Sequence, residues 1–139
     1  MAFLSKSCIY GIRAAIYCSF NKNGKYIPID EISRELNIPG DYLTKILQKL
    51  TKKNIMESLR GAKGGVKLKN NKKVSLLDIV NAIDGDSLFS NCFLNLEGCS
   101  EKNPCPMHQH WKNYRTEIKK FLKRGTLSYF AGNNLFKRI

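Results

Sequence analysis

Long apolar runs are missing from this sequence of 139 residues: none approaches the ~20 residues that a membrane-spanning helix needs. We therefore expect a soluble protein with no membrane partner. Lys6 and Arg13 interrupt the apolar character of residues 1–20, and no small-residue cleavage site follows before Asn21, so this stretch is interpreted as a mature helix and not as a signal peptide. Without export, the expected compartment is the reducing cytoplasm, where five cysteines serve as ligands, sensors or buried thiols in preference to disulfides.

Acidic side chains and histidines are also scarce. Eleven Asp and Glu stand against 24 Lys and Arg, which gives a formal charge of +13 and a pI near 9.7. A charge of this size favours a polyanionic partner, and nucleic acid in preference to an anionic membrane. Only two histidines are present, and nothing around them suggests the base, orienting residue and oxyanion site of a Cys/His nucleophilic enzyme. We therefore expect no enzyme activity.

What is present is an apolar fraction of 42%, enough for a packed core, with apolar residues at helical spacing through the first half of the chain. After a first helix, a short helix with Pro28 in its first turn is followed by a tight connection and a longer basic helix. This order is typical of a helix-turn-helix, although an ordinary αα-hairpin would give the same pattern in this segment alone. The expected helices are 4–20, 27–36 and 41–53, with the connection at 37–40.

Two short strands are predicted next, at 55–60 and 66–69, joined by the glycine-rich segment 61–65. A helix-turn-helix followed directly by a basic β-hairpin is a winged helix, so the predicted fold class is mainly α with a small β-hairpin. A charge run is often only a solvated face, but here the charge falls on the two elements that would touch DNA. Glu57 is the one acidic residue in the range 45–73. The basic residues of this range are Lys45, Lys49, Lys52, Lys53, Arg60, Lys63, Lys67, Lys69, Lys72 and Lys73.

The second half of the chain carries two further predicted helices. Ser75 and Asp78 form a capping box that opens a short helix ended by Gly85, and a strong helical pattern rich in aromatic residues runs from 106 to 123. The region between them, 84–106, is expected to be irregular. This long helix could pack on the first helix of the same chain, but a dimerisation helix is favoured because helix-turn-helix proteins usually read two half-sites through a two-fold axis. The expected organisation is a winged helix-turn-helix domain (1–85), an irregular cysteine-rich cluster-binding loop (86–108) and a dimerisation helix with a C-terminal tail (106–139).

Three of the five cysteines lie in that loop, in the spacing Cys92-x6-Cys99-x5-Cys105-x2-His108. Three thiolates and an imidazole can hold zinc or an iron–sulfur cluster, or the thiols can act as redox switches. The close C-x2–4-C pairs of zinc ribbons are missing, which disfavours zinc but leaves a Cys3His site open. Wide, uneven spacing on a loop suits a cluster whose ligands come from around its rim.

The fourth ligand is less constrained by the sequence. His108 is the candidate because only two residues separate it from the third cysteine, although a polar contact at the end of a helix is its alternative role. Cys8 in the first helix could reach the cluster of the same or of the partner subunit. Cys18 is expected to be a buried thiol, and His110 to be solvated.

Short motifs spread over nearly the whole chain match one known family. They are Ser5-Lys6 with Tyr10, Asp41-Tyr42-Leu43, Arg60-Gly61 with Gly64-Gly65, Leu77-Asp78-Ile79-Val80-Asn81-Ala82-Ile83, the three loop cysteines, Cys105-Pro106-Met107-His108 with Trp111, and Thr126-Leu127. Together they resemble the Rrf-two family of bacterial winged-helix regulators, and in particular its iron–sulfur, IscR-like and NsrR-like, members. The resemblance implies a homodimer that binds double-stranded DNA at a palindromic operator. It also implies one [2Fe–2S] cluster per subunit on Cys92, Cys99 and Cys105, with His108 at the position of the fourth ligand of IscR-like members, and a DNA affinity tuned by the state of the cluster.

The sequence departs from the family pattern at four places. The first cysteine gap has six residues where the IscR-like pattern has five, so we expect the loop to bulge by one residue. NsrR-like members use an acid near the N-terminus as a ligand, and no acid precedes Asp30 here, which disfavours that arrangement. Thr44-Lys45 replaces a Glu-Gln pair of the recognition helix, so a different DNA sequence should be read. Ala62-Lys63 replaces a Pro-Gly pair of the wing, which adds a charge near the minor groove or the DNA backbone.

The expected DNA contacts follow from these positions. Thr44, Lys45 and Lys49 are predicted to face the major groove, in a recognition helix opened by Asp41 and Tyr42. Phosphates or the adjacent minor groove are the expected partners of Lys6, Arg60 and Lys63. The cysteine loop is expected to pack against the DNA-binding domain of the partner subunit, so that loss of the cluster loosens the DNA-reading helices.

Overall fold

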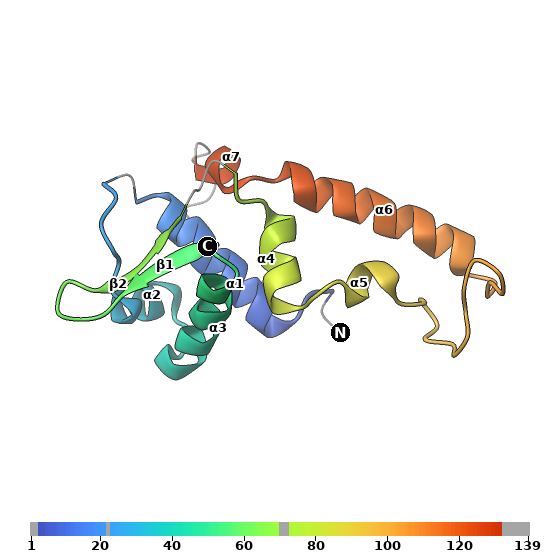
Figure 1. Cartoon of the computed structure of the whole chain (residues 1–139), viewed down its shortest axis with the longest axis horizontal. Coiled ribbons are helices and arrows are strands. Elements are labelled where there is room, and N and C mark those ends of the chain that lie inside the picture. Colours follow the sequence, from blue (N-terminus) through green and yellow to red (C-terminus); the bar gives the residue numbers. More distant parts are fainter. Residues whose placement is uncertain (1–2, 22, 70–72, 132–139) are drawn as a thin grey trace.

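The structure is a computed structural model that describes residues 3–21, 23–69 and 73–131. It is mainly helical with one two-stranded antiparallel hairpin, which confirms the predicted fold class. Figure 1 shows α1 to α4 and the hairpin gathered in one body, from which the long helix α6 extends. The elements are α1 (Lys6–Ser19), α2 (Ile29–Leu36), α3 (Gly40–Lys52), β1 (Met56–Leu59), β2 (Gly65–Leu68), α4 (Leu76–Ile83), α5 (Ser87–Ser90), α6 (His108–Arg124) and α7 (Leu127–Ala131).

The turn between α2 and α3 follows from its local chemistry. Acidic side chains occupy the first turn of α2, where they face the positive end of the helix dipole. Asn37 ends α2 in the left-handed conformation with φ 54°, and its N–H reaches back to the carbonyl oxygens of the last turn. Pro39 then precedes α3, whose apolar stripe of Leu43, Leu47 and Leu50 is buried in the core. The predicted helix-turn-helix is therefore present.

The wing is held to the body through the segment before α2. β1 pairs with β2 from Met56 opposite Leu68 to Leu59 opposite Gly65. Ile27 adds a short antiparallel bridge, because its N–H donates to the Val66 carbonyl (2.8 Å) and its carbonyl accepts from the Val66 N–H (2.9 Å). Gly65 has φ +146°, and a Cβ there would overlap the Ile27 carbonyl, so a side chain is excluded at this point of close approach.

A second apolar cluster forms where α1, α4 and α6 meet. It contains the buried side chains Cys8, Leu77, Val80 and Leu122. The predicted capping box at Ser75 opens α4, with both of its hydrogen bonds made. The end of α6 is tied to the body by the backbone, since Leu76 N–H donates to the Gly125 carbonyl (2.8 Å).

Most of α6 lies outside this cluster. Leu122 near its C-terminal end is buried, whereas Tyr114 and Phe121 are 65% and 59% exposed. The region 84–106 was predicted to be irregular, and this prediction was wrong at the one-turn helix α5. The helix lies against α6, and this contact stabilises a turn that is too short to show a helical pattern in the sequence. Across the described residues, no helix has the length and apolar character required to cross a membrane.

Candidate metal centre and nucleic-acid interface

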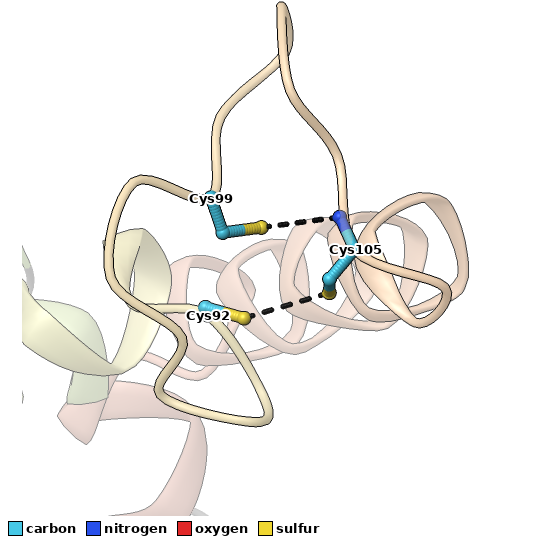
Figure 2. A group of neighbouring side chains, drawn as sticks. All are labelled: Cys92, Cys99 and Cys105. Atoms are coloured by element: carbon cyan, nitrogen blue, oxygen red, sulfur yellow. Dashed lines mark hydrogen bonds between the residues drawn. The ribbon is translucent and has the colours of Figure 1, made fainter.

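The three loop cysteines converge on one another, as Figure 2 shows. The sulfur atoms of Cys92, Cys99 and Cys105 all lie within 4.8 Å of each other. The Sγ atoms of Cys92 and Cys105 are 3.5 Å apart, and the Cys105 N–H donates to the Cys99 sulfur at 3.4 Å. This group of three thiols, called the thiol triad below, is half-buried and could bind one metal centre from one side.

Tight turns between the cysteines bring the triad together. Within the first gap, Asn95 and Gly98 have the left-handed φ values of 54° and 77°, so the chain turns twice over a short distance. The turns are closed by the Asn95 N–H donating to the Cys92 carbonyl (3.1 Å) and the Cys99 N–H donating to the Leu96 carbonyl (3.3 Å). These contacts accommodate the six-residue gap between Cys92 and Cys99.

The loop is anchored on α6 just ahead of the first cysteine. The Asn91 carbonyl accepts hydrogen bonds from Trp111 Nε1 at 2.9 Å and from Arg115 Nη1 at 3.4 Å. The Phe93 ring packs on the Trp111 ring with their centroids 5.4 Å apart. Cys92, between Asn91 and Phe93, is therefore positioned by a helix and not by loop turns alone.

His108 is the first residue of α6 and lies beside the triad. Its Nδ1 is 3.4 Å from the Cys99 sulfur, and its side chain is only 12% exposed. Its Nε2 is 3.3 Å from Glu101 Oε1, an ion-pair distance without hydrogen-bond geometry, and this buried nitrogen has no hydrogen-bond partner among the described residues. Glu101 Oε1 is also 2.7 Å from Lys112 Nζ, and these two neighbours, Lys112 first, lower the pKa of the Glu101 carboxyl.

These residues fit a metal centre by their donor set. Three thiols within 4.8 Å and an imidazole next to them are the ligand types that iron–sulfur clusters and zinc share. A buried ring nitrogen without a hydrogen bond is costly, and such a nitrogen beside three thiols is consistent with a binding site for an ion.

The thiols of the triad do not ionise alike. The backbone N–H of Leu96, and then that of Leu94, lower the pKa of the Cys92 thiol to about 7. For Cys99, the Cys105 amide lowers the pKa, but desolvation and the neighbouring thiols outweigh it, and the net pKa is raised. A bound cation would deprotonate all three, because thiolates are the ligands.

The two other cysteines lie elsewhere in the fold. Cys8 is 0% exposed inside the α1–α4–α6 cluster, and burial, followed by the charge of Asp84, raises the pKa of its thiol to about 12. Cys18 is buried in the main core, as expected, and burial followed by Glu31 raises its pKa to about 12. The structure does not bring Cys8 into the thiol triad of its own chain, and His110 is exposed as expected.

The predicted DNA-reading residues of α3 fall on its outer face. Lys45, Lys49 and Asp41 are exposed, and half-buried Thr44 donates its hydroxyl to the Gly40 carbonyl at 2.9 Å. Tyr42 is different: its hydroxyl is 2.6 Å from that of Ser7, and its ring packs edge-on against Tyr10, 5.7 Å between centroids. It therefore joins α1 to α3.

A groove separates α3 from the wing. Its volume is about 910 Å³, and Thr44, Gln48, Lys52 and Arg60 line it. Lys63 is exposed in the wing turn, and exposed Lys6 at the start of α1 has its Nζ 5.6 Å from the Tyr10 ring centroid. Sequence reasoning missed Gln48, although its spacing of four residues from Thr44 places it on the same face.

Comparisons with known proteins agree with this architecture. The family model of Rrf2, described as an iron-dependent transcriptional regulator, matches residues 4–133. The HTH-type transcriptional regulator IscR of Yersinia pestis is 26% identical over 125 residues, 89% of this chain and 76% of its own length.

Solved structures give the same result for the fold. CymR, the global cysteine regulator of B. subtilis, superposes with a TM-score of 0.80 over 96% of this chain and 100% of its own, at 21% identity. Staphylococcus aureus CymR has a TM-score of 0.75 at 25% identity, covering 93% of this chain and 98% of its own. With the family match spanning nearly the whole sequence, from the first helix to beyond the long one, the chain belongs to the Rrf2 family of transcriptional regulators.

Proposed function

We propose that this protein is a cytoplasmic homodimeric regulator that binds a palindromic operator and carries a [2Fe–2S] cluster on its cysteine loop. The observation that carries the proposal is the convergence of three thiols within 4.8 Å, beside a buried imidazole, in a chain of this family. Cys92, Cys99 and Cys105 would hold the cluster, with His108 as the fourth ligand. When bound, the cluster supplies an iron centre that responds to iron–sulfur status, oxidants or nitric oxide.

DNA binding would use the exposed cations of α3 and the wing. Lys45 and Lys49 are exposed on α3, away from its buried stripe. The groove of about 910 Å³ between α3 and the wing is lined by the neighbouring Thr44 and Gln48. Thr44 and Lys45 would contact base edges, whereas Lys49, Arg60 and Lys63 would neutralise phosphates. Phosphate contacts of this kind supply affinity, and the base contacts supply specificity.

Dimerisation would cover the outer face of α6. Tyr114 and Phe121 are 65% and 59% exposed on a helix that is buried only at Leu122. Large aromatic side chains exposed together are typical of interfaces. A two-fold pairing through α6 would place two winged domains on the two half-sites of one operator.

A chain of contacts supports coupling between the loop and α3. Asp84 lies where α4 ends and the loop begins, and its carboxylate accepts hydrogen bonds from the Ser5 N–H (3.0 Å) and from the Ser5 hydroxyl. Two residues further along the chain, the Ser7 hydroxyl pairs with that of Tyr42 at the start of α3. A change in the loop would therefore reach the recognition helix through the N-terminal end of α1.

The first experiment is purification without oxygen, followed by measurement of iron, sulfide and zinc. We expect a red-brown protein with about two irons and two sulfides per chain, the composition of a [2Fe–2S] cluster. Operator affinity of the holo and apo forms is then compared across a salt series. Colourless protein with stoichiometric zinc would support a structural Cys3His zinc site instead, and equal affinity of both forms would refute sensing.

One distance favours a second candidate, a metal-free thiol switch. The Cys92 and Cys105 sulfurs are 3.5 Å apart, so a small movement would allow a disulfide. In that reaction a peroxide takes two electrons from the two thiols, each of which loses its proton, and is reduced to water or alcohol. An aerobic apo protein with a Cys92–Cys105 disulfide, and operator affinity that changes with this bond alone, would support the switch.

A further inference from the structure

We propose that Glu101, held by Lys112, is a positioning residue for His108. Its carboxylate accepts a hydrogen bond from His108 Nε2–H, which leaves Nδ1, with its lone pair free, as the nitrogen that faces the thiol triad. This inference rests on the proposed metal centre and concerns how its fourth ligand is prepared. Glu101 belongs to none of the motifs that carry the family resemblance.

The geometry places the two ring nitrogens on different partners. Nδ1 is 3.4 Å from the Cys99 sulfur, on the side of the triad. Nε2 is 3.3 Å from Glu101 Oε1 and is buried, so solvent does not reach this nitrogen while the Glu101 side chain is in place. A small rotation of the exposed Glu101 side chain would complete the missing hydrogen bond.

The position of the imidazole proton decides which ring nitrogen can bind a metal. Neutral imidazole carries one N–H, and only the other nitrogen has a lone pair for a metal. A carboxylate that accepts from Nε2–H fixes the proton there, keeps the Nδ1 lone pair free and orients the ring. Without Glu101, the Nδ1–H tautomer is also allowed, and in it Nδ1 cannot be a ligand.

The fold explains why Glu101 reaches this position. The N–H groups of Ser100 and Asn103 each donate to the other residue's carbonyl (3.2 and 3.1 Å), which closes a turn with Glu101 inside it. Lys112 lies four residues after His108 on α6, so both face this turn, and its Nζ is 2.7 Å from Glu101 Oε1. The carboxylate thus has a fixed cation on one side and the imidazole on the other.

An exposed pair of this kind has little value for folding. The side chains of Glu101 and Lys112 are 65% and 44% exposed, and surface ion pairs contribute little to stability. Variants at Glu101 should therefore fold as the wild type does, which separates a positioning role from a structural one.

The test has two readouts on full-length protein. In the apo protein, ¹⁵N chemical shifts of His108 report its tautomer, and we expect Nε2–H in the wild type and a mixture of tautomers in Glu101→Ala. In anaerobically loaded protein, the rate of metal loss to a chelator should rise about 10–100-fold in Glu101→Ala. Glu101→Gln, whose amide oxygen still accepts a hydrogen bond, should recover most of both properties.

Two controls make the result specific. Glu97→Gln removes another exposed carboxylate of the same loop and should leave both readouts unchanged. In a His108→Ala background, Glu101→Ala should have no further effect on metal loss. Wild-type tautomer and wild-type metal retention in Glu101→Ala would overturn the inference, as would an equal effect of Glu101→Ala with and without His108. Failure of the wild type to bind iron and sulfide would instead refute the proposed function, while the tautomer measurement still decides the role of Glu101.

Discussion

Removal of the Lys49 charge offers a quantitative test of the proposed DNA-binding surface. Lys49 is exposed in the last turn of α3, and in the described part of the chain no carboxylate pairs with it. Its ammonium is therefore free to neutralise a phosphate. Alanine is a better helix former than lysine, so Lys49→Ala should leave the fold intact.

The expected effect follows from counterion release. Each lost phosphate contact lowers the slope of log affinity against log salt by about 0.9, hence by about 1.8 for the two subunits of a dimer. The ratio of wild-type to Lys49→Ala affinity should therefore fall about 12-fold between 50 and 200 mM salt, for a slope change of about 1.8. If only one subunit made the contact, the ratio should fall about 3.5-fold. The loss of affinity in Lys49→Ala should be nearly the same for operator and for unrelated DNA, because phosphates carry no sequence information.

The assay is fluorescence anisotropy with labelled duplexes over this salt range. Lys123→Ala is the matched control, because it removes the same charge from the exposed last turn of α6. Equal slopes for Lys49→Ala and Lys123→Ala would refute the assignment of α3 as the DNA-contacting helix. A slope change near 0.9 in place of 1.8 would show that only one subunit uses Lys49.

Three further outcomes follow from the structure. Lys45→Ala should change the preferred operator, altering discrimination at the contacted base pair by about 1–3 kcal/mol, as competition between operator variants would show. In cluster-free protein, iodoacetamide should modify Cys92 first, with a rate that rises through pH 7 because the thiolate reacts and the pKa of Cys92 is about 7, whereas Cys18, with a pKa of about 12, should react only on unfolding. Gly65→Ala should lower the free energy of unfolding by about 1–3 kcal/mol through backbone strain, measured by urea denaturation. In Gly40→Ala the new Cβ would meet only the Ser33 Oγ at 3.8 Å, so the free energy of unfolding should stay the same or rise by up to about 1 kcal/mol. A similar loss of stability in Gly65→Ala and Gly40→Ala would contradict this reasoning.

Much of the fold was predictable because its signals are local. The apolar stripe of α3, the capping box at Ser75 and the tight turn at Gly61 and Gly64 each depend on contacts within a few residues. The structure contains each predicted element. The expectation that failed, an irregular segment at 84–106, failed because α5 depends on its contact with α6 and not on a pattern of its own.

The sites were predictable to a different extent. The spacing of Cys92, Cys99 and Cys105 indicated a common site, and the three sulfurs do converge. Nothing in the sequence indicated that Asn91 would anchor the loop on α6, because a backbone carbonyl leaves no mark in residue identity. Glu101 was equally hidden, since one exposed acid in a polar loop has no periodic or spacing signal.

The sequence by itself thus determined the order and type of the elements, the basic character of α3 and the wing, and the identity of the three thiols, since all of these depend on residue chemistry and short spacing. Only the tertiary structure decided which polar groups meet. It buried Cys8 between α1, α4 and α6, away from the thiol triad of its own chain. It also turned one nitrogen of His108 toward Cys99 and the other toward Glu101. Such contacts join residues from separate turns and helices, and their distances are set by how those elements pack.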